Sequence, residues 1–259
     1  MLKFFGRGSA FRENQNCAFF VEENRLILID CAMSAFHAVR RSELKNFGEE
    51  IREIYVMVTH THGDHIGGIP MLIHYAYFVF HVPVTVIVPS EELREDMKFV
   101  FDRLEGCNPA GYRLFTVEEI TGKAGSGPEE GTGLQGGGPE DSGFAASWLE
   151  CAIPTTHAPE LAGRCFGYTL RVDGRKVIYT GDTNTLEPFL PYLTEGSVLY
   201  TEVSCHESPV HLPVSRLLEY EPFFSEKKIE VYLMHLDDEE IILEQVKGTE
   251  FNPAPLFTE

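Results

Sequence analysis

The chain has 259 residues, of which 43% are hydrophobic and 24% are charged, as in an ordinary globular protein. Acidic residues outnumber basic ones by 40 to 21, which gives a net charge of −19. A protein that grips a nucleic-acid backbone ordinarily carries a basic surface, so this charge disfavours a large polyanionic partner. No apolar run reaches the about 20 residues of a membrane span, and the N-terminus lacks a signal-peptide pattern. We therefore expect a cytoplasmic protein without a membrane partner.

The first half of the chain alternates between predicted strands and predicted helices, which is typical of a layered α/β domain. Apolar runs and helical periodicity predict strands at 2–5, 17–21, 26–30, 54–58 and 84–88, and helices at 34–52, 69–80 and 91 to about 104. A hairpin turn at Glu23-Asn24 joins two of the strands. Ser90 is placed to cap the helix that begins at residue 91.

Residues 121–143 interrupt this pattern. Nine of these 23 positions are glycine and two are proline, and almost none is apolar. A segment of this composition buries too little apolar surface to offset the entropy lost on ordering. We interpret it as a flexible, acidic, Gly-rich insertion in a single domain that spans residues 1–259, and not as a boundary between domains.

The second half begins again with strands. They are predicted at 148–156, 167–172, 176–180, 198–203 and 229–234, with a hairpin turn at Asp173-Gly174. The chain therefore reads as two similar halves of strands followed by helices. This organisation suits two sheets packed face to face with helices outside them.

The most informative stretch is residues 59–68, THTHGDHIGG, which directly follows an apolar run. Its candidate ligands are His60, His62, Asp64 and His65. Imidazole and carboxylate groups are the side chains that bind zinc and similar divalent metals. In an extended backbone His60 and His62 point to the same side. Gly63 permits a sharp turn after them, so the next two ligands can reach the same space, with room for a second ion.

This motif resembles the signature of the metallo-β-lactamase superfamily, whose members share a four-layer αββα sandwich with a metal site at one edge. Three later strand ends carry single candidate ligands, His157, Asp182 and His235, in the order of the superfamily pattern. The resemblance implies one ion held by His60, His62 and His157, another held by Asp64, His65 and His235, and Asp182 as the bridge between them. It also implies that Asp30, at a strand end, orients a loop of the metal site.

Two divalent metal ions are therefore the expected cofactors. Zinc suits an imidazole-rich site, and manganese or iron are the alternatives. Two such ions lower the pKa of a water between them and hold a bridging hydroxide as the nucleophile, with Asp64 as its hydrogen-bond acceptor. Hydrolysis is the predicted reaction.

Two further segments resemble ribonuclease Z and related phosphodiesterases. The opening Gly6-Arg7-Gly8-Ser9-Ala10-Phe11 is similar to theirs, and residues 199–211 resemble the segment that holds their proton donor. Glu202 matches a family glutamate and His211 the histidine that protonates the leaving oxygen, whereas Thr201 replaces the family's first histidine. The resemblance implies that Glu202 keeps His211 charged as a general acid. An ordinary surface ion pair is the alternative.

These features predict a metal-dependent hydrolase, closest to the ribonuclease Z-like phosphodiesterases, with a small-molecule or nucleotide phosphodiester as substrate. Ribonuclease Z captures tRNA with a protruding arm, but the acidic charge of this chain disfavours tRNA. The alternatives are hydrolysis of another ester, a lactone, a thioester or a lactam at the same site, or a metal-binding module without catalysis. A flavodiiron redox protein is disfavoured, because position 62 is not glutamate and no flavin-binding domain is present. A homodimer is compatible with the sequence.

Overall fold

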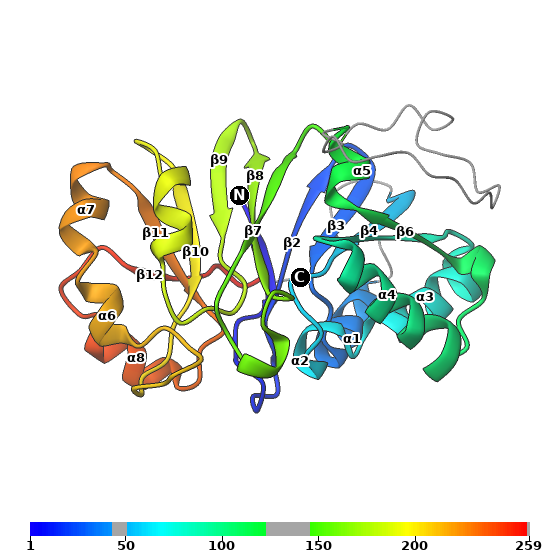
Figure 1. Cartoon of the computed structure of the whole chain (residues 1–259), viewed down its shortest axis with the longest axis horizontal. Helices are drawn as coiled ribbons and strands as arrows, with labels where there is room; N and C mark the ends of the chain where they lie inside the picture. Colours follow the sequence, from blue (N-terminus) through cyan, green and yellow to red (C-terminus); the bar gives the residue numbers. More distant parts are fainter. Residues whose placement is uncertain (43–50, 123–145, 258–259) are drawn as a thin grey trace.

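Two six-stranded mixed sheets form the centre of the molecule. The structure is a computed structural model that describes residues 1–42, 51–122 and 146–257. Within these residues the sheets lie face to face between two groups of helices (Figure 1). The predicted α/β class and αββα layering are therefore confirmed.

The two sheets repeat one pairing pattern. The first contains β1 (Lys3–Gly6), β2 (Cys17–Glu22), β3 (Arg25–Ile29), β4 (Glu53–Met57), β5 (Val84–Val88) and β6 (Tyr112–Thr116). The second contains β7 (Leu149–Pro154), β8 (Phe166–Val172), β9 (Arg175–Tyr179), β10 (Val198–Glu202), β11 (Glu230–Met234) and β12 (Asn252–Pro253). In each sheet the strands lie side by side in chain order. The first two pairings are antiparallel and the next three are parallel. The prediction of two similar halves is confirmed.

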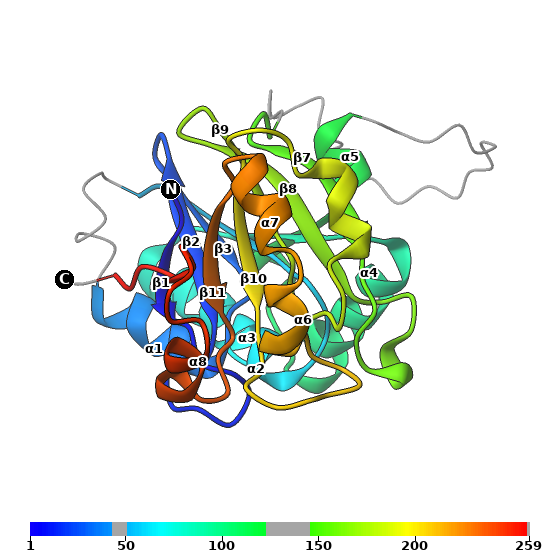
Figure 2. The same cartoon turned by 90° about the vertical axis from the view of Figure 1, so that its left-hand side faces the viewer.

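Helices cover the outer face of each sheet. The first sheet is covered by α1 (Met33–Ser42), α3 (Ile69–Tyr75) and α4 (Glu91–Phe99), and the second by α6 (Val214–Leu218), α7 (Glu221–Glu226) and α8 (Glu239–Gln245). Figure 2 looks onto the second group, which lies in front of β10 and β11. The short helices α2 (Gly63–Ile66) and α5 (Val117–Thr121) complete the α-helices of the described residues. None of the described helices has the length and apolar character that a membrane span needs.

The observed helices differ from the predicted ones mainly at their ends. The helix predicted at 34–52 is α1, which ends at Ser42, and residues 43–50 lie outside the described part of the chain. Both α3 and α4 continue as π-helical turns, Ala76–Phe80 and Val100–Leu104, so the predictions at 69–80 and 91–104 are confirmed. Ser90 caps α4 as predicted, because its Oγ accepts a hydrogen bond from the Leu93 N–H at 3.4 Å. The predicted insertion at 121–143 lies almost entirely outside the described residues.

Alternation of side chains along the strands divides the core into layers. In β3, Ile27 and Ile29 point into the space between the sheets, whereas Leu26 and Leu28 point toward the helices. All four side chains are fully buried. Since both faces of the strand are covered, it reads in the sequence as one continuous apolar run.

The two sheets come into direct contact at the edge where β4 and β9 end. The Tyr168 hydroxyl donates a hydrogen bond to the Val58 carbonyl, and the Phe166 N–H donates one to the Thr59 carbonyl at 3.1 Å. Gly181 follows β9 with a φ of +58°, and a Cβ there would lie 2.5 Å from the Phe166 carbonyl oxygen. The backbone after β9 therefore packs too closely on its neighbours to accept a side chain.

Replacing this glycine tests that close approach. We expect Gly181→Ala to lower the free energy of unfolding by more than the about 1–2 kcal/mol that a left-handed conformation costs by itself. The matched control is Gly106→Ala, because Gly106 has a φ of +61° but a Cβ there would meet no atom within 4 Å. Urea denaturation of both variants measures the difference, and equal losses of stability would contradict the argument.

Candidate metal centre

The predicted ligands follow strands whose carboxyl ends share one edge of the sandwich. His60 follows β4, Asp182 follows β9 and His235 follows β11. β7 runs in the same direction as β9, because both are antiparallel to β8, and His157 therefore leaves at the same edge. This edge is at the bottom of Figure 1, where α2 lies. The structure brings all seven predicted ligands together there.

The His-rich motif changes conformation in its middle. His62 is extended, with φ −64° and ψ 150°, and α2 begins at the next residue. Two ligands thus come from extended chain and two from a helical turn. The turn does not depend on the glycine for space, because a Cβ at Gly63 would meet no atom within 4 Å. Packing requires glycine at the two later positions of the motif, because a Cβ would lie 2.5 Å from the Gly63 carbonyl oxygen at Gly67 and 2.3 Å from the Ala32 carbonyl oxygen at Gly68.

The first group of candidate ligands consists of three imidazole nitrogens. His62 Nδ1 lies 3.0 Å from His60 Nε2 and 3.3 Å from His157 Nε2. A tetrahedral zinc ion with bonds of about 2.0–2.1 Å places neighbouring ligand atoms about 3.3 Å apart. These two distances are close to the spacing that one such ion needs, and all three nitrogens lie within 4.8 Å of one another.

The second group lies beside the first and shares a carboxylate with it. Asp64 Oδ2 lies 3.2 Å from His235 Nε2 and 3.3 Å from His65 Nε2. Asp182 faces both groups: its Oδ2 is 3.8 Å from His60 Nε2 and 3.5 Å from His235 Nε2. Its Oδ1 is 3.5 Å from His65 Nε2. The Asp182 carboxylate is therefore the candidate ligand that faces both groups.

In the candidate ligands His157 and His65, the hydrogen bond made by Nδ1 determines which ring nitrogen carries the proton. His157 Nδ1 lies 2.7 Å from the Val210 carbonyl oxygen, which can only accept, so the ring donates from Nδ1 and its Nε2 carries a lone pair. His65 Nδ1 lies 2.8 Å from Asp30 Oδ2, as the predicted orienting role of Asp30 requires. Among the described residues His65 Nε2 is buried without a hydrogen-bond partner, and it faces carboxylate oxygens of Asp64 and Asp182 at 3.3 and 3.5 Å. A buried polar atom without a partner is costly, and a cation would satisfy this one, so the residues present fit a metal ion.

The pKa shifts of the cluster differ between its two groups of side chains. Burial, together with the neighbouring His65, lowers the pKa of His60, and burial lowers that of His157. Burial alone would raise the pKa of Asp64, but His235 and His65 outweigh it, so the pKa is lowered. Burial alone would lower the pKa of His65 and of His235, but Asp182 outweighs it and raises both, so these two rings carry positive charge that balances the ionised carboxylates.

Glu202 and His211 form a pair beside these groups. Glu202 is buried at the end of β10, where its Oε2 accepts a hydrogen bond from His211 Nδ1 at 2.7 Å. The His211 ring centroid lies 4.9 Å from that of His157. Burial, with the nearby Asp182, raises the pKa of Glu202 to about 7. Burial alone would lower the pKa of His211, but the bond to Glu202 outweighs it and raises that pKa to about 9. The shared proton therefore resides on His211.

Sequence reasoning missed the residues that hold the surrounding loops. The Asp237 carboxylate accepts hydrogen bonds from Ser204 Oγ at 2.6 Å and from the Cys205 N–H at 2.9 Å. It thereby joins the loop after β11 to the loop after β10. No local pattern signals such a contact, because the partners are more than 30 positions apart.

The arrangement of the whole chain matches known structures. YhfI from Bacillus subtilis, a metallo-β-lactamase fold protein, superposes with a TM-score of 0.68 over 99% of this chain and 97% of YhfI, at 15% identity. This chain has the metallo-β-lactamase fold. A diphosphatase of the PhnP family (TM-score 0.67, 14% identity, 99% and 95% covered) and the short form of human tRNase Z (0.60, 17%, 99% and 97%) share it.

Sequence comparison finds relatives of this metallo-β-lactamase fold chain among phage proteins. The family model described as "Anti-Pycsar protein Apyc1" matches residues 1–101. The protein of that name from Bacillus phage BSP38 is 28% identical over 254 residues, which cover 92% of this chain and 89% of the phage protein. The one from Bacillus phage vB_BveM-Goe7 is 27% identical over 248 residues, with the same shares covered. The similarity therefore extends over nearly the whole chain.

Metal uptake tests the two groups of candidate ligands. We expect the chelator-treated protein to take up two zinc ions per chain and to melt at a higher temperature when loaded, because binding to the folded state alone stabilises it. His157→Ala should lose one ion and most of that increase. His37→Ala, which alters an exposed histidine on α1, is the control and should behave like the wild type. Elemental analysis with thermal melts measures both effects, and full uptake by His157→Ala would contradict the assignment.

Proposed function

We propose that the protein is a metal-dependent phosphodiesterase in which one domain, residues 1–259, acts on a small-molecule or nucleotide phosphodiester. The observation that carries this proposal is the position of Asp182 between two groups of metal-ligand side chains, with the Glu202–His211 pair beside them. With divalent ions bound, such a site would combine Lewis acids with a proton donor. Hydrolysis of a phosphodiester needs both.

The seven side chains would divide between two divalent ions as the superfamily resemblance implies. His60, His62 and His157 would hold one ion, Asp64, His65 and His235 the other, and Asp182 would contact both. Two ions held in this way polarise a phosphoryl oxygen and lower the pKa of a water toward neutrality. The imidazole-rich set favours zinc, with manganese or iron as alternatives. PqqB from Methylobacterium extorquens, which shares the fold with a TM-score of 0.60 and 10% identity, is a zinc-bound example.

The protein's own groups then position the water and supply the proton. Asp64 stays ionised, because its pKa is lowered, and a carboxylate oxygen can accept a hydrogen bond from the attacking water and orient it. The Nδ1–H of His211 donates a hydrogen bond to Glu202, so the proton on Nε2 is the one available to a leaving oxygen. Glu202 keeps the ring charged and fixes its orientation.

The proton donor favours a substrate with a poor leaving group. A sugar hydroxyl leaves as a strongly basic alkoxide, and protonation removes that barrier, whereas a good leaving group gains little. The names of two fold neighbours, a diphosphatase and a tRNase Z, refer to bonds between phosphorus and oxygen. The net charge of −19 disfavours tRNA and favours a substrate with a single phosphodiester.

A substrate panel tests this function. We expect metal-loaded protein to hydrolyse bis(p-nitrophenyl) phosphate and at least one class among 3′,5′-cyclic nucleotides, 2′,3′-cyclic nucleotides and linear dinucleotides, but not a lactone, thioester or lactam. His62→Ala should lower kcat/KM by more than the about 10–100-fold typical of residues that only orient a ligand. Turnover of the lactone alone, or no turnover by metal-loaded protein, would overturn the proposal.

The leaving group tests the role of His211. We expect His211→Ala to slow release of an alkoxide by about 100- to 10,000-fold and release of p-nitrophenolate far less, because a stable leaving group needs no proton. Glu202→Gln should show the same selectivity with a smaller loss. Rates for matched diesters with each leaving group provide the measurement. Equal slowing of both substrates by His211→Ala would remove it as the proton donor.

A further inference from the structure

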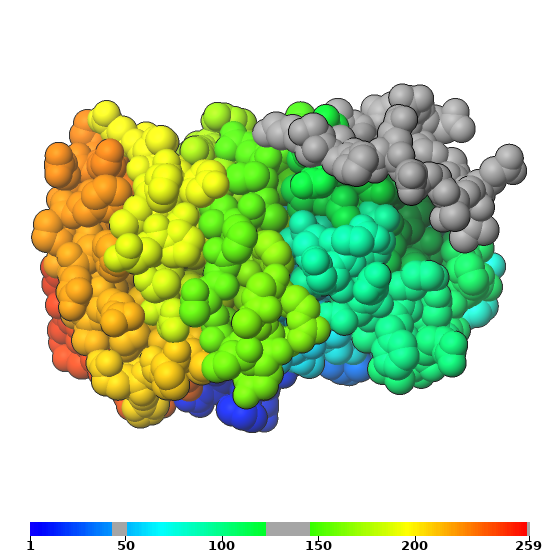
Figure 3. Space-filling view, in the orientation of Figure 1, coloured from blue at the N-terminus to red at the C-terminus, as the bar shows by residue number. Residues whose placement is uncertain are grey.

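The loop between β1 and β2 carries an aromatic side chain that packs against nothing. Phe11, near the tip of this loop, is 101% exposed, the largest value among the exposed hydrophobic side chains of the described residues. The loop projects from the lower edge of the molecule, the edge of the candidate metal centre (Figures 1 and 3). An aromatic ring held in water at that edge is available to a bound molecule.

The loop is held in place by backbone hydrogen bonds. The Arg12 N–H donates to the Ser9 carbonyl at 3.0 Å and the Gly8 N–H to the Asn14 carbonyl at 2.9 Å, which close the tip. The Leu236 N–H donates to the Arg7 carbonyl at 2.8 Å. Since Leu236 directly follows the candidate ligand His235, the loop is fixed to the metal-site edge.

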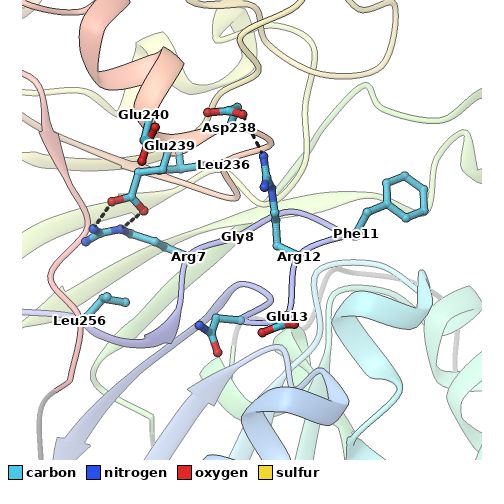
Figure 4. Close-up of a pocket in the computed structure, with 11 residues that line it drawn as sticks. Arg7, Gly8, Phe11, Arg12, Glu13, Leu236, Asp238, Glu239, Glu240 and Leu256 are labelled. Atoms are coloured by element: carbon cyan, nitrogen blue, oxygen red, sulfur yellow. Dashed lines mark hydrogen bonds and ion pairs between the residues drawn. The ribbon is translucent and has the colours of Figure 1, made fainter.

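The two arginines of the loop are already paired with acids. Arg7 makes two hydrogen bonds to the Glu239 carboxylate, at 2.6 and 2.9 Å. Arg12 donates to the Asp237 carbonyl at 2.5 Å and lies 3.2 Å from Asp238 Oδ2. Figure 4 shows both pairings and the Phe11 ring pointing away from the Arg7–Glu239 pair. These cations therefore contribute little net positive charge to attract a phosphate.

We infer that Phe11 is a stacking platform for the planar base of a nucleotide phosphodiester, an inference that rests on the proposed phosphodiesterase function. Stacking on an aromatic ring contributes about 1–3 kcal/mol per base and requires no charge. Stacking on Phe11 can therefore contribute affinity for a nucleotide although the loop arginines are neutralised and the chain is strongly acidic. Because every base has an aromatic face, the platform tolerates different bases and selects for the presence of one.

The test compares a nucleotide phosphodiester with its counterpart in which a methoxy group replaces the base at C1′ of the ribose. We expect Phe11→Ala to lower kcat/KM for the nucleotide by about 5- to 150-fold, mainly through KM, as 1–3 kcal/mol of stacking implies. The counterpart without a base should be hydrolysed as by the wild type. Phe11→Trp should retain the nucleotide rate, because a larger ring also stacks.

Phe78→Ala is the matched control. Phe78 is 64% exposed and lies on the π-helical turn Ala76–Phe80 in the outer helical layer, so its removal should change neither rate. Equal effects of Phe11→Ala on the two substrates, or no effect on the nucleotide, would overturn the inference. So would a change in oligomeric state by size-exclusion chromatography, since it would assign the ring to contact with a second copy.

Binding measurements separate this inference from the proposed function. A nucleotide phosphorothioate analogue that resists hydrolysis is titrated into the metal-loaded wild type, Phe11→Ala and Phe78→Ala. Weaker binding by Phe11→Ala alone supports the platform even if no substrate is turned over, which would then overturn only the phosphodiesterase proposal. Equal binding by all three proteins overturns the platform while leaving the hydrolysis assays to decide the function.

Discussion

The buried carboxylate of Asp30 is the constraint on which the candidate metal centre depends. Asp30 is fully buried, and its oxygens lie within 2.8 Å of the Thr59 N–H, the Thr59 hydroxyl and His65 Nδ1. A buried charge is tolerated only when such partners replace water. Through Thr59, whose Oγ1 lies 3.0 Å from His60 Nδ1, the same carboxylate also orients the His60 ring. One residue at the end of β3 thus positions two candidate ligands that follow β4.

The backbone at these strand ends is held in an unusual conformation. Asp30 and His235 have φ values of +59° and +52°, and Gly181 has +58°. The left-handed conformation costs a non-glycine residue about 1–2 kcal/mol, so packing and hydrogen bonds must hold the first two in place. All three turn the chain directly at or before a residue of the site. Left-handed backbone conformations therefore occur at the strand ends from which the candidate functional side chains project.

The sequence predicted what depends on neighbours in the chain and missed what depends on distant contacts. The candidate ligands were found because each follows an apolar strand, and the Ser90 cap because it precedes an acidic first turn. β6 was missed although Tyr112, Leu114 and Phe115 pack against the core, because the strand is short and its apolar side chains are only partly buried. The anchoring of His157 by the Val210 carbonyl links residues 53 positions apart and has no local signature. The turn predicted at Gly63 is present, since α2 begins there, but only the fold reveals that the close backbone approaches of the motif are at Gly67 and Gly68.

Both halves of the sandwich contribute side chains to the candidate site. The first sheet supplies four candidate ligands from one strand end, and the second supplies His157, Asp182 and His235 from three. Neither half contains a complete set for two ions, and Asp182 faces ligands of both halves. Metal binding would therefore add attraction between the halves where Phe166 and Tyr168 already join them to the loop after β4. Ions held by side chains of both halves would stabilise the packing of the two sheets at this edge, so metal binding is expected to be linked to the stability of the fold.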